Sequence, residues 1–344
     1  MSQQHVLVTG GSGFLGGHVV LEALARGHCV RSTVRSLDRE KAVRASLNEA
    51  GMTAGDRLEF VAADLTRDEG WPEALDGIDR VIHVASPVMP GHVENEEEVI
   101  VPAREGTLRV LQAARDAKVA RVVLTSAFHA VAWGHPHDDR VFTEEDWTIL
   151  DGPGTDTYGR SKTLAERAAW DFLAADGGDM ELTTLLPVAV MGPVLSAEVS
   201  GANRVVQRLL SGQMPGLLNL HFPVVDVRDI AAAHVIAATM PGAAGQRLLL
   251  GSSPALTMAE IAHLLRTHLG QAAAHVPTES IPDETVRAGA ATNPALSSVV
   301  QELGYARRFS TAKARDLLGW KPRPSHKAVV AAGQSMVDRG LVGL

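Results

Sequence analysis

Apolar runs alternate with amphipathic segments through the first half of the chain. Runs rich in Val, Ile and Leu predict strands at residues 5–9, 29–34, 58–62, 81–84, 121–125 and 182–186. Between them, apolar residues at helical spacing predict helices at residues 13–27, 41–50, 71–75, 94–118 and 156–175. Strands that alternate with helices form βαβ units with right-handed crossovers. The pattern therefore predicts an α/β fold built on a doubly wound, mostly parallel sheet.

The pattern loosens beyond about residue 192. Gly and Pro become frequent, and predicted helices at residues 202–210 and 258–269 are separated by loops and short apolar runs. Two of these runs, at residues 222–227 and 247–251, are candidates to return to the first sheet. We therefore expect a sheet domain over residues 1–190 and a smaller C-terminal part over residues 191–344, with segments near 222–251 returning to the first.

Composition narrows the class of protein. The 344 residues carry 32 Lys and Arg against 40 Asp and Glu, a net charge of -8, so a nucleic-acid binder is not expected. The single cysteine, Cys29, excludes an intrachain disulfide and a cysteine-based zinc site. The apolar runs are too short to span a bilayer. We expect a cytoplasmic protein with no membrane, nucleic-acid or metal partner.

Glycines follow the first predicted strand, in the run Thr9-Gly10-Gly11-Ser12-Gly13-Phe14-Leu15-Gly16. The spacing fits both Gly-x-Gly-x-x-Gly and Gly-x-x-Gly-x-x-Gly. Glycine allows a tight turn, close approach of the backbone to a pyrophosphate and close packing of the helix on the sheet. The free N–H groups of the helix N-terminus then face the phosphates. The loop predicts dinucleotide binding, and residues 1–190 become a candidate Rossmann domain.

The end of the second predicted strand favours NADP over NAD. NAD-binding domains usually place a carboxylate there for the ribose 2′-hydroxyl, but no acidic residue precedes Asp38. Arg35 can instead clamp a 2′-phosphate. Asp64, followed by Leu65, comes after the third strand. Its carboxylate can accept a hydrogen bond from the adenine amino group, or simply cap a helix.

A Tyr–Lys pair opens the helix predicted at residues 156–175. Tyr158 and Lys162 are four positions apart, so they share one face of the helix. A free tyrosine titrates near ~10. A lysine ammonium one turn away and the positive helix N-terminus both favour the phenolate, so we expect a lowered pKa at Tyr158. Such a phenol can donate a proton to a developing alkoxide.

With these motifs the chain resembles the extended short-chain dehydrogenase/reductases. Within them it is similar to the dihydroflavonol reductase-like group, which includes cinnamoyl-CoA reductases and aldehyde and ketone reductases. The likeness rests on the glycine loop, the Tyr–Lys pair and their flanks, and on the runs at residues 81–87, 225–234 and 313–320. It implies NADPH-dependent reduction of an aldehyde or ketone to an alcohol, with residues 191–344 mainly binding the carbonyl substrate.

The resemblance also implies a set of site residues. Tyr158 donates the proton, while Lys162 binds the nicotinamide ribose and tunes Tyr158. The expected cofactor-binding residues are Gly10, Gly13, Phe14, Leu15, Gly16, Arg35, Asp64, Leu65, Ala85, Lys162, Pro187 and Val190. The expected substrate-binding residues are Ser86, Val88, Phe128, His129, Val194 and Phe222.

One position departs from the family. Relatives carry Thr-Ser-Ser after the fifth strand, and the second serine orients the substrate carbonyl, whereas this chain has Thr125, Ser126 and Ala127. We expect Ser126 to take over this third catalytic role. His129 is the alternative, because it shares the parity of Ala127 along an extended segment.

Two other functions compete with a carbonyl reductase. A sugar-nucleotide epimerase or dehydratase uses the same scaffold, but it usually retains NAD, and Arg35 argues against NAD. A non-catalytic NADP-binding protein is the other, and Ala127 is the feature that favours it.

Overall fold

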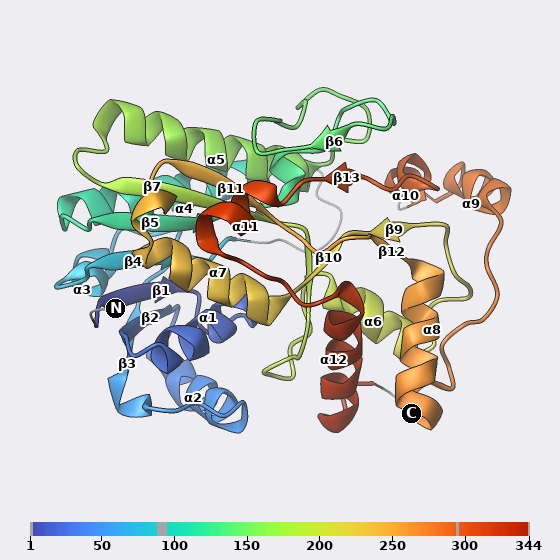
Figure 1. Cartoon of the computed structure of the whole chain (residues 1–344), viewed down its shortest axis with the longest axis horizontal. Coiled ribbons are helices and arrows are strands. Elements are labelled where there is room, and N and C mark those ends of the chain that lie inside the picture. The colour runs from blue at the N-terminus through green and yellow to red at the C-terminus, as the bar shows by residue number, and fades with distance from the viewer. Residues whose placement is uncertain (1–2, 88–94, 294–295, 343–344) are drawn as a thin grey trace.

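A sheet of seven parallel strands forms the centre of the computed structural model, which describes residues 3–87, 95–293 and 296–342. The strands are β1 (His5–Thr9), β2 (Cys29–Val34), β3 (Leu58–Ala62), β4 (Arg80–His83), β5 (Arg121–Thr125), β7 (Glu181–Pro187) and β11 (Gln246–Leu250). Their order is β11-β7-β5-β4-β1-β2-β3 (Figure 1). The order reverses between β1 and β4, which is where doubly wound sheets bind their ligands.

Helices cover both faces of this sheet (Figure 1). They are α1 (Phe14–Ala25), α2 (Glu40–Glu49), α3 (Trp71–Leu75), α4 (Glu97–Asp116), α5 (Thr157–Asp176), α7 (Val227–Thr239) and α11 (Ala312–Leu318). Val20 of α1 and Ile230 of α7 share one buried cluster with the sheet, and Trp71 and Val110 belong to the cluster on the other face. Because both faces are covered, β5 and β7 are buried almost throughout. The prediction of a doubly wound α/β sheet is confirmed.

The smaller C-terminal part has its own core. Its helices are α6 (Asn203–Leu210), α8 (Met258–Leu269), α9 (Asp283–Ala290), α10 (Ser297–Glu302) and α12 (Ser325–Asp338). Val206 of α6, Leu265 of α8 and Val329 of α12 are fully buried in one cluster. Within the described residues, short 3-10 turns lie at η1 (Leu37–Arg39), η2 (Gly55–Arg57), η3 (Phe128–Ala130), η4 (Pro241–Ala243) and η5 (Gly270–Ala273).

Three pairs of short strands lie outside the main sheet. They are β8 (Ala189–Met191) with β10 (Val224–Asp226), β9 (His221–Phe222) with β12 (Leu256–Thr257), and β6 (Val141–Phe142) with β13 (Arg308–Phe309). Of the two segments expected to return to the first sheet, residues 247–251 largely coincide with β11, which pairs with β7. The expectation for residues 222–227 is wrong. The chain leaves the sheet after Pro187, continues as β8, and β10 pairs with that extension instead.

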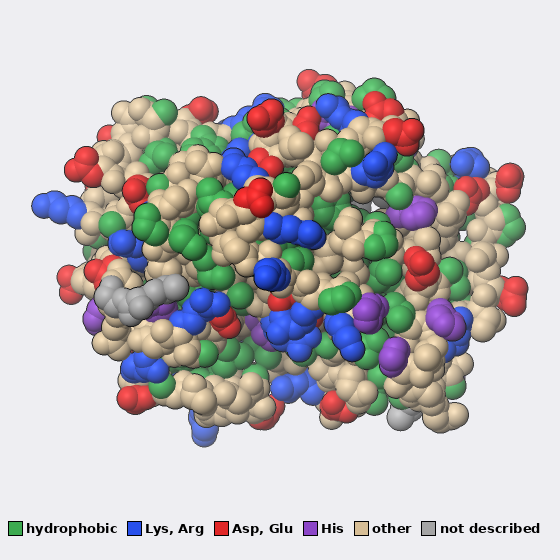
Figure 2. All heavy atoms as spheres, viewed as in Figure 1, with side chains coloured by type: hydrophobic (Ala, Val, Ile, Leu, Met, Phe, Trp, Pro, Cys, Tyr) green, Lys and Arg blue, Asp and Glu red, His purple; other side chains and the backbone are tan. Residues whose placement is uncertain are grey.

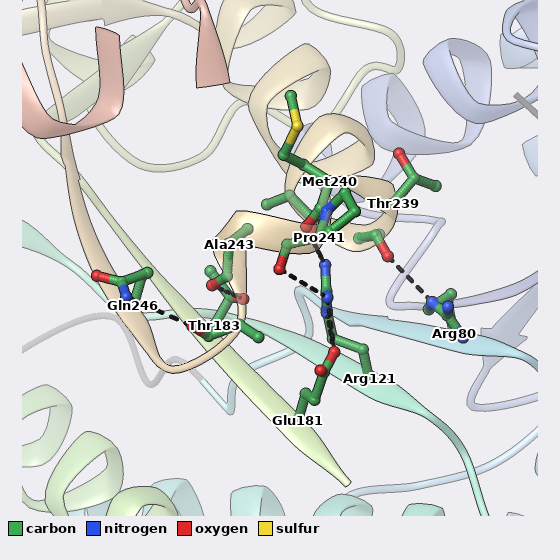
Figure 3. A network of polar contacts seen from close by, with 12 residues as sticks. Arg80, Arg121, Glu181, Thr183, Thr239, Met240, Pro241, Ala243 and Gln246 are labelled. Atoms are coloured by element: carbon green, nitrogen blue, oxygen red, sulfur yellow. Dashed lines mark hydrogen bonds and ion pairs between the residues drawn. The ribbon is translucent and has the colours of Figure 1, made fainter. Parts of the chain in front are cut away.

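Two arginines fasten the end of α7 to the sheet (Figure 3). The Arg121 guanidinium donates to the carbonyl of Ala237 at 2.9 Å and to the Glu181 carboxylate at 2.8 Å. Arg80 Nε donates to the carbonyl of Ala238 at 3.1 Å. The last carbonyls of a helix lack partners within the helix, and cations there also oppose its dipole. Strands β4 and β5 therefore hold α7 at the edge of the sheet opposite the glycine loop.

Charges of both signs are interspersed over the face shown in Figure 2. In the described ranges, none of the helices has the length and apolar character needed to cross a membrane. The same ranges contain no group of three or more His, Cys, Asp or Glu side chains arranged to hold a metal ion.

Candidate active site

The glycine loop joins β1 to α1 at the carboxyl edge of the sheet. Gly10 has φ +73°, and the N–H of Gly13 donates to the carbonyl of Gly10 at 2.9 Å. A Cβ at Gly16 would lie 2.2 Å from the Gly10 carbonyl oxygen, so a side chain does not fit there. Gly13 is the N-cap of α1, and no side chain caps the helix. The loop therefore leaves the first N–H groups of α1 available to an anion.

A cavity of about 90 Å³ opens beside this loop. Gly13 and Phe14 line it from the loop, Arg39 from the turn after β2, and Leu195 and Ser196 from the C-terminal part. Arg39 is not among the cofactor-binding residues expected from the sequence. Its position within four residues of Arg35 was the available signal. The cavity places a cation against the glycine loop, as a phosphate group requires.

Arg35 and Asp64 occupy the ends of neighbouring strands, β2 and β3. Arg35 is exposed directly after β2. Asp64 Oδ1 accepts hydrogen bonds from the N–H and the hydroxyl of Thr66, at 2.9 and 2.8 Å. The Thr66 backbone N–H lowers the pKa of Asp64 most, and the nearby Arg35 charge lowers it further. One Asp64 oxygen therefore closes its own turn. Leu65 packs beside Gly106, where an added Cβ would lie 3.1 Å from that of Leu65.

Tyr158 and Lys162 lie on the first turns of α5. The carboxylate of Asp156 caps this helix by accepting the N–H of Gly159 at 2.8 Å. Lys162 Nζ lies 5.8 Å from the centre of the Tyr158 ring, so the two share one face as expected.

The expected lowering of the Tyr158 pKa is not found. Desolvation, helped by the Asp156 carboxylate, raises the pKa of Tyr158 to about 12. Burial lowers the pKa of Lys162 to about 8. The charge of Lys162 does not outweigh the desolvation and the Asp156 charge, which raise the pKa of Tyr158. Tyr158 therefore stays protonated at neutral pH.

The other residues expected near the nicotinamide follow the strand ends. Ala85 comes two residues after β4, and its N–H donates to Thr9 Oγ1 at 3.0 Å. Ser86 lines a small cavity together with Lys162. Pro187 ends β7, and Val190 lies within β8. Leu15 belongs to the first turn of α1 and packs against the sheet core.

Ser126 lines the same small cavity as Ser86 and Lys162, but its hydroxyl is already engaged. Its Oγ donates to Oε2 of Glu166 at 2.7 Å, and both residues are buried. A hydroxyl has one proton to donate, and here that proton is used by a buried carboxylate. Thr125 Oγ1 is likewise engaged, at 2.8 Å from Nε2 of His234. The expectation for Ser126 therefore does not agree with this geometry.

His129 lies beside the Tyr–Lys pair. Its ring is 4.9 Å from the Tyr158 ring, edge to face at 76°, and stacks on Trp133 at 3.6 Å and 15°. Burial, and next the positive charge of Arg307, lower the pKa of His129 to about 3. The imidazole is therefore neutral over the physiological range of pH.

The remaining expected substrate residues lie elsewhere. Phe128 is only 1% exposed and packs among Trp133, Phe142 and Phe309. Val194 is buried with the core of the C-terminal part. Phe222 is half-buried in β9. Val88 falls outside the described residues. The structure thus brings Ser86 and His129 to the Tyr–Lys pair and places Phe128 and Val194 in cores.

Comparisons with known proteins agree with this arrangement. The model of the NAD dependent epimerase/dehydratase family matches residues 6–251. Cinnamoyl-CoA reductase 1 of Arabidopsis thaliana is 37% identical over 251 residues, which are 72% of this chain and 70% of that protein. Ketoreductase azaE of Aspergillus niger is 30% identical over 97% of this chain and 98% of that protein. Gre2 of Candida albicans, solved in complex with NADPH, superposes with a TM-score of 0.79 at 25% identity, over 97% of this chain and 99% of that one.

Proposed function

The chain belongs to the NAD dependent epimerase/dehydratase family, and from this premise we propose that it reduces an aldehyde or ketone to an alcohol with NADPH. The reductases among its relatives support an oxidoreductase that acts on carbonyl groups. The observation that carries the proposal is the meeting of a glycine loop, a protonated Tyr158 and a half-buried Lys162 at the carboxyl edge of one sheet.

The residues present fit a dinucleotide. The Gly10–Gly16 turn is too tight for a Cβ at residue 16, and no side chain caps the first N–H groups of α1, which would therefore be available to a pyrophosphate. Arg35 and Arg39 would hold the 2′-phosphate of NADPH. Asp64 would meet the adenosine with its second carboxylate oxygen, since the first already binds Thr66.

The remaining cofactor contacts come from the strand ends. Gly13, Phe14, Leu15, Leu65, Ala85, Pro187 and Val190 would complete the wall along the dinucleotide, and Lys162 would bind its nicotinamide ribose. The Gre2 structure, which holds NADPH, supports this choice of cofactor. The division at about residue 190 remains part of the proposal, with residues 191–344 mainly facing the substrate.

Tyr158 is the proton donor in this mechanism. When bound, the cofactor supplies hydride to the carbonyl carbon. Tyr158 Oη then gives its proton to the oxygen, and the pKa near 12 keeps that proton in place until the oxygen becomes basic. The Lys162 ammonium, held against the Tyr158 ring, stabilises the phenolate that remains.

The test measures NADPH consumption by the purified chain against a panel of aliphatic and aromatic aldehydes and ketones. We expect turnover with NADPH well above that with NADH. The chain has two tyrosines, so Tyr305→Phe is the matched control for Tyr158→Phe and should keep wild-type turnover. NADPH binding without turnover on any carbonyl would contradict the proposal and favour a binding protein. Epimerisation of a sugar nucleotide with retained NAD would contradict it in favour of that family activity.

A further inference from the structure

In the proposed reaction, Tyr158 donates a proton to the carbonyl oxygen, and a second hydrogen-bond donor could act on the same oxygen. Reduction places negative charge on that oxygen, and a second donor aimed at it stabilises the transition state. Ala127 has no hydrogen-bonding side chain, and the Ser126 hydroxyl is 2.7 Å from Glu166 and donates to it. His129 is a side-chain donor that the structure places against the Tyr158 ring, with 4.9 Å between the ring centres.

The imidazole of His129 is fixed in position, but its nitrogens make no hydrogen bond in the described part of the chain. Within residues 3–87, 95–293 and 296–342, neither ring nitrogen has a hydrogen-bond partner, and neither is a fully enclosed unpartnered atom. Its backbone, by contrast, is fixed. Thr148 Oγ1 donates to the His129 carbonyl at 2.7 Å and accepts the N–H of Trp133 at 3.0 Å. The ring therefore has a set position beside Tyr158, with both nitrogens free to take a hydrogen-bond partner.

The indole of Trp133, four residues along the chain, and a cation from the C-terminal part, Arg307, anchor this ring. His129 stacks on Trp133 at 3.6 Å, and the Arg307 guanidinium lies 4.1 Å from the centre of a Trp133 ring. Arg307 also donates to the Ala132 carbonyl at 3.1 Å and pairs with the Glu302 carboxylate. Its side chain is only 8% exposed. Arg307 and Ala132 are 175 residues apart in the sequence, so this contact orders a long side chain at a cost in conformational entropy.

We propose that His129 donates a hydrogen bond to the substrate carbonyl oxygen and is a catalytic residue, while Trp133 and Arg307 are its positioning residues. This inference rests on the proposed function. Hydride adds to the carbonyl carbon, the C=O π electron pair moves to the oxygen, and the oxygen takes the proton of Tyr158 Oη. His129 keeps its own proton and stabilises the charge on oxygen while the transfer proceeds.

The charges around His129 agree with a neutral donor. Arg307 and Lys162 both oppose protonation of the ring, and Glu302 alone favours it. Burial opposes it more strongly than any of them. A neutral imidazole has one N–H, which suits a hydrogen bond, whereas an imidazolium would compete with Tyr158 to give up a proton.

The decisive variant is His129→Phe, which keeps an aromatic ring on Trp133 and removes the donor. We expect kcat/KM for an aldehyde to fall on the order of 10²-fold, the usual effect of losing one such donor, with an unchanged Kd for NADPH. His137→Phe is the matched control, because His137 also stacks on an aromatic ring, that of Tyr305 at 3.8 Å and 8°. It should leave both values unchanged.

Two further variants separate catalysis from structure. Adding Ala127→Ser to His129→Phe supplies a hydroxyl on the same strand end and should recover tenfold or more of the lost rate. Arg307→Met should lower kcat severalfold in the wild-type background and not at all in His129→Phe, because a positioning residue acts only through the ring it positions.

The outcomes distinguish this inference from the proposed function. Turnover that is lost in Tyr158→Phe but retained in His129→Phe would overturn the role of His129 and leave the reductase standing. The role would return to Ser126 if Ser126→Ala lowered kcat/KM tenfold with intact NADPH binding while His129→Phe kept the turnover of the wild type. A wild-type chain that reduces no carbonyl would refute the proposed function itself.

Discussion

Glu166→Gln should strongly destabilise the fold, because Glu166 is the centre of a buried network. Its carboxylate is 1% exposed and accepts hydrogen bonds from Ser126 at 2.7 Å, Thr184 at 2.8 Å and Arg247 at 2.8 Å. Glutamine has nearly the same size, but its NH₂ group would face donors, and Arg247 would lose its counter-charge. Removing one partner of a buried ion pair typically costs about 3–5 kcal/mol.

The expected change is large enough to measure by two routes. The free energy of unfolding in urea should fall by about 3–5 kcal/mol. With an unfolding entropy of about 2.1 cal/mol/K per residue over 344 residues, the same loss lowers Tm by roughly 4–7 °C. Circular dichroism during urea and thermal unfolding gives both values. The urea m-value shows whether the wild type and the Glu166→Gln variant expose the same surface area on unfolding.

Glu181→Gln is the matched control for this prediction. Glu181 also pairs with a buried arginine, Arg121, but its own side chain is 46% exposed, and Arg121 keeps its contacts to the carbonyls of α7 (Figure 3). An exposed partner of this kind contributes about 0–1 kcal/mol. If Glu166→Gln cost no more than Glu181→Gln, the view of Glu166 as the fixed acceptor of the Ser126 proton would be refuted.

The remaining predictions concern the reaction itself. Tyr158→Phe should lower kcat by roughly 10²–10⁴-fold without changing the Kd for NADPH, as single-turnover and binding measurements would show; unchanged kcat would exclude Tyr158 as the acid. The kcat/KM for NADPH-dependent reduction should fall as pH rises through about 8, where Lys162 loses its charge, while Tyr158 stays protonated. In Lys162→Arg the same profile should stay flat through that range, because arginine keeps its charge. Arg35→Ala should raise the KM for NADPH by about tenfold to a hundredfold and leave that for NADH nearly unchanged, since only a 2′-phosphate is lost as a partner; equal losses would remove Arg35 from this role.

The elements predictable from the sequence are those specified by local pattern. The predicted strands at residues 5–9, 29–34, 58–62 and 121–125 have the bounds of β1, β2, β3 and β5. For β1 and β5 the reason is burial on both faces, which makes each strand a nearly continuous apolar run. The three pairs of two- and three-residue strands were not predictable in the same way. Partners such as Phe142 and Phe309 are too far apart in the sequence for a short window to relate them.

The same distinction applies to the candidate site. The glycine loop and the spacing of Tyr158 and Lys162 are local features, and the structure presents both at the sheet edge. The side-chain direction of Ser126 depends on Glu166, forty residues later, and on Arg247, which pairs with Glu166 from β11. The pKa of Tyr158 depends on desolvation, which no spacing of two residues specifies. The parity argument for His129 assumed an extended segment, and this premise is wrong, because residues 128–130 form the 3-10 turn η3. The stack of His129 with Trp133 is a local contact.

The residues around the candidate site come from two parts of the chain, one inside and one beyond the segment that the family model matches. The family model matches residues 6–251, which contain the glycine loop, the Tyr–Lys pair and His129. Arg307 and Glu302 lie beyond it, yet they reach back to Trp133 and Ala132 through the loop that leads into β13. If His129 has the role proposed above, changes at Arg307 would alter its position without touching the residues proposed to bind the dinucleotide. In the proposed reaction, the residues that position His129 for the substrate carbonyl differ from those that bind the cofactor, and Tyr158 is next to both groups.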